Sequence, residues 1–231
     1  SDEHQLYTQI SKGFRAPQAT ELYRLQNSQS VSAIDAEEID SIEIGLRGGP
    51  ETISYDLSWY RLNKDNFIFL DTNRANVDNG QTAHTGIDLR LHWQINDQAS
   101  LAAAWTHAKH TYENNPALSS VNLAGNDIDT APRNMGSLQF NWLPTNHLSG
   151  ELEWLYLGGY FTNPENTVKY PGHNLVNLRL QYEFSNKLLA FLRVTNLTDT
   201  DYAERADFAF GSERYFVGEP LGAYFGIRLT R

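Results

Sequence analysis

The chain has 231 residues with 28 acidic and 18 basic side chains, so its net charge is -10 and a nucleic-acid partner is not expected. Its mean hydropathy is -0.51, and no run of about 18 apolar residues occurs, which excludes a transmembrane helix. Cysteine is absent, which excludes a disulfide scaffold and a thiolate metal site and suits a chain that crosses an oxidising periplasm.

About ten stretches of the chain alternate apolar with polar side chains. A period of two places successive side chains on opposite faces, so each stretch is predicted to be a β-strand with one apolar and one polar face. In chain order the predicted strands cover residues 4–14, 41–47, 53–59, 87–95, 101–105, 138–142, 148–156, 174–184, 188–197 and 223–229.

The connections between these strands alternate between short and long. Short turns are predicted near Gly49, Asp97, Thr145 and Asn186. The long polar loops cover residues 18–38, 64–81, 113–133, 161–172 and 200–220. Bacterial outer-membrane barrels have short periplasmic turns and long extracellular loops, so this asymmetry predicts which end of the sheet lies outside the cell.

The predicted strand over residues 174–184 distinguishes between a membrane β-sheet and a soluble one. Its apolar face consists of Val176, Leu178, Leu180, Tyr182 and Phe184. Soluble strands are usually about 5–6 residues long, whereas a tilted strand needs about 9–11 residues to cross an outer membrane. The length and the alternation together favour an all-β fold, a transmembrane antiparallel β-barrel, over a soluble β-sandwich.

Two groups of residues carry a resemblance to a known family. Near the N-terminus, Tyr7 to Pro17 and then Glu21-Leu22-Tyr23 follow the pattern Y-x-x-x-S-x-G-F-R-A-P-x-x-x-E-L-Y, whose motif residues here are Gly13, Phe14, Arg15 and Pro17. Near the C-terminus, Val194 to Asp199 followed by Tyr202 match V-x-N-L-T/F-D-x-x-Y, with motif residues Asn196, Leu197, Asp199 and Tyr202. Residues 38–46, 79–88 and 218–220 match further segments in the same order. The chain therefore resembles the C-terminal barrel of TonB-dependent outer-membrane receptors.

The resemblance implies a 22-stranded barrel with a plugged lumen, of which residues 1–231 form one domain with about the last ten strands. The N-terminal plug domain and the signal peptide are expected in the rest of a longer chain. The family usually ends on an aromatic residue, whereas this chain ends on Thr230-Arg231.

The function that the resemblance implies is energised uptake of a scarce ligand across the outer membrane of a Gram-negative bacterium. A ferric siderophore or a related iron complex is the expected ligand, and haem, cobalamin and oligosaccharides remain open. The expected partners are the plug domain, the TonB-ExbB-ExbD complex and outer-membrane lipid. The alternatives are a passive channel or porin, which needs no plug and no partner, and a non-transporting adhesin barrel.

Ligand-binding residues are expected at the outer mouth and on the polar face of the sheet. Tyr23 and Arg24 fall near the mouth, and Arg90 and Arg179 fall on the polar face, where they would attract an anionic chelate. The competing interpretation is that these arginines form cross-strand ion pairs that also contact the plug.

Metal and catalytic sites are not expected. His107 and His110 are three residues apart on one strand, so their side chains point to opposite faces. Asn126, Asp127 and Asp129 lack the full pattern of a calcium loop and are interpreted as a solvated turn. No nucleophile or nucleotide-binding motif occurs, so the chain is predicted not to be an enzyme and to need no cofactor.

Overall fold

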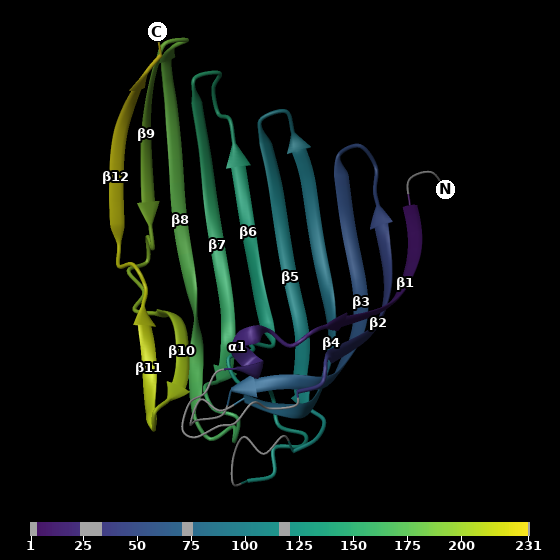
Figure 1. The fold of residues 1–231 in the computed structure, drawn as a ribbon. Coiled ribbons are helices and arrows are strands. Elements are labelled where there is room, and N and C mark those ends of the chain that lie inside the picture. Colours follow the sequence, from purple (N-terminus) through teal and green to yellow (C-terminus); the bar gives the residue numbers. More distant parts are fainter. Residues whose placement is uncertain (1–3, 24–33, 71–75, 116–120, 231) are drawn as a thin grey trace.

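The structure is a computed structural model that describes residues 4–23, 34–70, 76–115 and 121–230 (Figure 1). Its strands are β1 (His4–Arg15), β2 (Glu37–Gly48), β3 (Ile53–Leu70), β4 (Asn76–Asn96), β5 (Ala99–Tyr112), β6 (Asn134–Trp142), β7 (Leu148–Phe161), β8 (Lys169–Ser185), β9 (Leu188–Thr195), β10 (Ala203–Ala209), β11 (Ser212–Val217) and β12 (Gly222–Leu229). One short helix, α1 (Ala19–Leu22), follows β1. Among the described residues, no helix is both long and apolar enough to cross a membrane.

Ten of these strands form one antiparallel sheet in the order β1-β2-β3-β4-β5-β6-β7-β8-β9-β12. Each of β1 to β8 pairs with the next strand along the chain, and β9 pairs with β12 because β10 and β11 form a separate hairpin. The sheet curves but does not close, since no pairing joins β1 to β12 in the described part of the chain (Figure 1). The predicted all-β antiparallel fold is therefore confirmed, as a partial barrel.

The connections segregate to the two ends of the sheet as the sequence predicts (Figure 1). The turns after β2, β4, β6 and β8 are short and lie at one end, which we call the short-turn end. The connections after β1, β5, β7 and β9 are longer and lie at the other end, which we call the long-loop end.

The two faces of the sheet differ in chemistry. Leu57 on β3, Leu89 on β4 and Trp105 on β5 are directly opposite one another, and Leu57 and Leu89 are 41% and 36% exposed. The adjacent row on the other face contains Asp56, Arg90 and Ala104. A large apolar side chain gains nothing from such exposure in water, so this face is suited to contact with lipid.

Two segments predicted as loops contain strands among their described residues. The stretch 64–81 was predicted as a loop, but β3 continues to Leu70 and β4 starts at Asn76, with irregular pairing near Phe67 and positive φ angles at Asn66 and Asn79. The stretch 200–220 contains the β10–β11 hairpin, whose pairing starts at Ala203. Both segments lie at the long-loop end and lack the apolar–polar alternation that marks a strand in lipid, since β3 ends on the apolar run Phe67 to Leu70 and the two short hairpin strands mix apolar with charged residues.

Candidate functional site

A network of ion pairs and hydrogen bonds crosses β6, β7 and β8 on the polar face. Arg179 on β8 contacts the carboxylates of Glu151 and Glu153 on β7. The Glu153 carboxylate also accepts hydrogen bonds from Gln139 Nε2 at 3.0 Å and from Asn177 Nδ2 at 2.9 Å. Glu153 is 8% exposed, so its charge is balanced within the sheet rather than by bulk water.

A second polar group lies on β1 to β5 of the same face. Tyr7 donates a hydrogen bond to Glu43 Oε1 at 2.8 Å and also contacts Asp56 Oδ1 at 3.3 Å. Thr106 donates to Asp88 Oδ1 at 2.6 Å. Cross-strand contacts of this kind stabilise the pairing and leave the face strongly polar, as in the interior of a membrane barrel.

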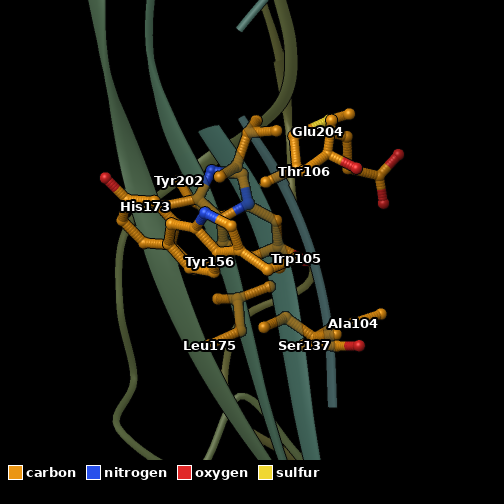
Figure 2. A pocket seen from close by; sticks show the side chains of 13 residues that line it. Ala104, Trp105, Thr106, Ser137, Tyr156, His173, Leu175, Tyr202 and Glu204 are labelled. Carbon is orange, nitrogen blue, oxygen red and sulfur yellow. The ribbon is translucent and has the colours of Figure 1, made fainter. Parts of the chain in front are cut away.

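A pocket of about 520 Å³ interrupts this polar surface (Figure 2). Its lining includes Ala104, Ser137 and Leu175, which lie toward one end, and His173 and Tyr202 at the other (Figure 2). Ala104 is paired with Arg90 and with Ser137, so these positions share the polar face. Tyr202 comes from the connection after β9, and its ring centroid is 4.7 Å from that of His173. The pocket is thus a partly apolar recess next to the connection between β9 and β12.

Arg15 explains the N-terminal family motif in physical terms. Its guanidinium contacts Glu37 at 2.6 and 2.8 Å and Glu21 on α1 at 3.0 Å through two donors. Glu37 also accepts the Ile68 N–H at 2.9 Å, and Glu21 accepts the Gln18 N–H at 2.6 Å. The Arg15 guanidinium holds the pKa of the Glu21 carboxyl below its usual value, against the opposing effect of burial. One side chain therefore ties the ends of β1 and β2 to α1.

The other residues of that motif have fewer contacts. Phe14 is 79% exposed on the apolar face, and Gly13 faces open space, opposite Ile39 on β2. Pro17 lies between β1 and α1, where its missing N–H and fixed φ suit the end of a strand.

Asn196 organises the C-terminal motif. Its backbone N–H donates to Asn177 Oδ1, and its side chain accepts the Thr200 N–H and donates to the carbonyls of Thr200 and Glu219. Asn196 has a φ of 49°, which asparagine adopts more readily than other residues with a Cβ. One buried side chain thus connects the start of the β9–β12 connection to its end.

The remaining motif residues complete this turn. Asp199, also at a φ of 49°, accepts the Leu221 N–H at 3.1 Å and so stabilises the turn. The Leu197 N–H donates to the Val176 carbonyl at 2.7 Å. A Cβ on Gly218 would overlap the Tyr202 ring, so only glycine fits there without movement. These motif residues shape the backbone rather than line a binding site.

The predicted ligand-binding residues fall in different places. Tyr23 is exposed at the C-terminal end of α1, and Arg24 lies outside the described residues. Arg90 and Arg179 lie on the polar face, each six residues from its short turn and so closer to the short-turn end. Arg179 forms ion pairs with Glu151 and Glu153, which agrees with the ion-pair interpretation for that residue.

The loop containing Asn126, Asp127 and Asp129 differs from the predicted solvated turn. Asp127 forms a bidentate pair with Arg133, while Asp129 accepts a hydrogen bond from Tyr112 at 2.7 Å. Burial raises the pKa of the Asp129 carboxyl, and nearby carboxylates raise it further. The three side chains point to separate partners. Across the described segments, no group of three or more His, Asp or Glu side chains is arranged to hold a metal ion.

Sequence reasoning missed two tyrosines that fix the β10–β11 hairpin. The Tyr160 hydroxyl donates to the Ala206 carbonyl at 3.1 Å and accepts the Ala206 N–H at 2.8 Å. Tyr170 makes the same pair of bonds with Ala203, at 3.2 and 3.1 Å. Each hydroxyl thus acts like a neighbouring strand for one residue of β10. These hydroxyl groups bond residues that are distant in the sequence, so no local sequence pattern identifies the partners.

The comparison with known families settles the relationship of this chain. Residues 1–197 match the family described as TonB dependent receptor-like, beta-barrel. The chain belongs to this family. The resemblance predicted from the motifs is therefore confirmed, and the TonB-dependent receptor barrel accounts for the ten-stranded sheet and its segregated loops.

Solved structures show the same fold at low sequence identity. The siderophore receptor PiuA from Acinetobacter baumannii matches 99% of this chain with a TM-score of 0.82 and 18% identity. The ferric yersiniabactin uptake receptor FyuA from Yersinia pestis matches 99% at 0.80 and 15%. The ferric citrate transporter FecA matches 99% at 0.79 and 20%. This chain covers 34%, 35% and 36% of these three proteins, so it corresponds to about a third of a whole receptor.

Proposed function

We propose that this chain is the C-terminal barrel portion of an outer-membrane receptor for TonB-dependent uptake of a scarce ligand. The observation that carries the proposal is the family match over residues 1–197. The exposed apolar face, the polar opposite face and the segregated loops agree with a sheet that crosses a membrane. The proposed function is transport, with no enzymatic activity and no resident cofactor.

The proposed ligand is a ferric siderophore or a related iron complex. Ferric chelates are named for the receptor FyuA and the transporter FecA, and a siderophore for the receptor PiuA, all of which share the fold. In this chain, Tyr23 and Arg24 would contact the ligand first. Arg90 is exposed on the polar face next to the pocket of Figure 2, where a cationic side chain attracts an anionic chelate.

The proposed partners follow from the proposed receptor function. The N-terminal plug domain of the full-length protein would fill the lumen and contact the polar face, including the Arg179–Glu153 network. The TonB-ExbB-ExbD complex would supply energy from the periplasmic side, and lipid of the Gram-negative outer membrane would cover the apolar face.

The test is uptake of radiolabelled iron supplied as citrate, catecholate or hydroxamate chelates. Cells that express the full-length gene should accumulate iron from at least one chelate, and deletion of either the gene or the tonB gene should abolish that accumulation. Accumulation that persists without TonB would support a passive channel. An absence of gene-dependent uptake and of any growth defect under iron limitation would support an adhesin.

Variants of two arginines test the ligand-binding face. Arg90→Gln should lower chelate affinity because it removes a positive charge from the polar face. Arg61→Gln is the matched control, since Arg61 lies on the opposite face, two residues from Trp59 on β3. Equal chelate affinity in the two variants would exclude Arg90 from ligand attraction.

A further inference from the structure

Two histidines meet on neighbouring strands near the long-loop end. His84 on β4 is directly opposite His110 on β5, and both side chains are partly buried. Their Nδ1 atoms are 2.8 Å apart and their ring centroids 5.0 Å apart. His84 is four residues from Asp88 on the same strand, so the pair lies on the polar face.

The protons of this pair define its chemistry. Each neutral imidazole carries one N–H, so a contact between two Nδ1 atoms contains one shared proton. The outer nitrogen of His84, Nε2, lies 3.0 Å from Thr82 Oγ1, and Thr82 is 2% exposed. If both rings carry their proton on Nε2, the His84 Nε2–H donates to Thr82 and both Nδ1 lone pairs face each other.

We propose that His84 and His110 form a binding site for a borderline divalent cation such as Cu²⁺, Zn²⁺ or Ni²⁺. Imidazole nitrogen is a preferred ligand of these ions. Two nitrogens bound to one such ion at about 2.0–2.1 Å lie roughly 2.8–3.4 Å apart for angles between 90° and 109°. The observed separation of 2.8 Å is at the lower end of this range, so the rings need to open by only a few tenths of an ångström.

The bond to Thr82 is a second, independent feature of this site. Histidines that bind metal ions generally donate their other N–H to a fixed acceptor, which sets the ring orientation and raises ligand basicity. Thr82 provides that acceptor to His84 from the neighbouring same-face position on β4. Ion binding moves the shared proton to Nε2 of its own ring, so both imidazoles stay neutral and the charge balances.

The charged groups around the pair set its strength. Lys64 on β3 is paired with Thr82 and acts against a bound cation, while Asp127 of the loop after β5 favours it. The described residues offer no third His, Asp or Glu ligand, so water completes the coordination and the ion is exchangeable. Protonation of either ring removes a lone pair, so binding decreases at low pH.

The test is Cu²⁺ binding to the full-length protein in detergent at pH 7.5, measured by titration calorimetry and by electron paramagnetic resonance. Wild-type protein should bind one Cu²⁺ ion with two equatorial nitrogen ligands. This bound ion should be absent from His84→Gln and from His110→Gln. Thr82→Val should weaken the same site about tenfold, since it removes the acceptor and keeps the volume. His107→Gln is the control, because His107 bonds Asn134 and lies on the other face.

Each variant must first show the heat-dependent gel mobility of a folded barrel. If one histidine variant fails this criterion, the other histidine variant provides the same comparison. Loss of one Cu²⁺ site in the His84 or His110 variant, with its retention in His107→Gln, supports the proposal. Identical stoichiometry and affinity in wild type and in the histidine variants would overturn it, as would a site that lacks nitrogen ligands.

Discussion

Replacing Tyr160 with phenylalanine removes one hydroxyl group and keeps the aromatic ring. In the folded chain this hydroxyl satisfies both backbone groups of Ala206, a residue with 0% exposure on β10. The ring stays in place against Tyr170, whose centroid is 5.3 Å away. The substitution therefore isolates the two hydrogen bonds from the packing of the side chain.

The expected cost follows from the two groups that lose their partner. A buried donor or acceptor without a hydrogen bond costs about 1–3 kcal/mol, so two such groups should cost roughly 2–6 kcal/mol. This free energy acts on the attachment of the β10–β11 hairpin rather than on the whole barrel. It corresponds to an increase of about 30- to 25,000-fold in the open population of the hairpin.

Amide hydrogen exchange of the full-length protein in detergent measures this opening. Peptides from β10 and β11 should exchange faster in Tyr160→Phe and in Tyr170→Phe, whereas peptides from β3 and β4 should not change. The matched control is Tyr215→Phe on the same hairpin, because the Tyr215 hydroxyl contacts the exposed Glu213 side chain. Unchanged exchange of β10 in Tyr160→Phe would refute the role assigned to this hydroxyl.

Three further predictions concern the sheet. Leu89→Arg places a charge on the lipid-facing side and should destabilise the barrel by about 2–4 kcal/mol in a refolding titration, and Arg90→Leu should cost less; the reverse order would mean that the register is shifted by one residue. Arg15→Ala leaves the buried Glu37 carboxylate without its cation and should destabilise the barrel by about 1–3 kcal/mol, less than the loss of a fully buried pair, because Arg15 is partly exposed. Proteolysis of the connection after β1 should accelerate, and an unchanged rate would contradict the role assigned to Arg15. Residues 1–231 expressed alone should aggregate or pair through the open edges of β1 and β12, and a protease-resistant monomer in detergent would show that the chain closes by itself.

The membrane-facing part of the fold was predictable because lipid imposes a strict rule on each strand. Every second side chain must be apolar there, and the alternation of Val176 to Phe184 follows from that rule. Toward the long-loop end a strand extends beyond the lipid, so the rule no longer applies. The extension of β3 to Leu70 therefore carried no alternation, and the β10–β11 hairpin was missed for the same reason.

The candidate sites were less predictable because they depend on the register between strands. The spacing of His107 and His110 correctly indicated different faces, and the two residues contact different partners. The sequence alone did not identify His84 as the partner of His110, because 26 residues separate them and the β4–β5 register decides the pairing. The same limit applies to Arg15, whose partner Glu37 lies across a 21-residue connection.

Labelling of single cysteines on intact cells tests the central claim that the sheet spans the outer membrane with its long connections outside. The chain contains no natural cysteine, so each introduced residue reports one position. A membrane-impermeant maleimide should label cysteine at Asn122 and at Asp201, on the long-loop side. It should label cysteine at Asp97 and at Asn186, on the short-turn side, only after the outer membrane is permeabilised. Equal labelling of both sets on intact cells would contradict the account, because the sheet would not then separate two compartments.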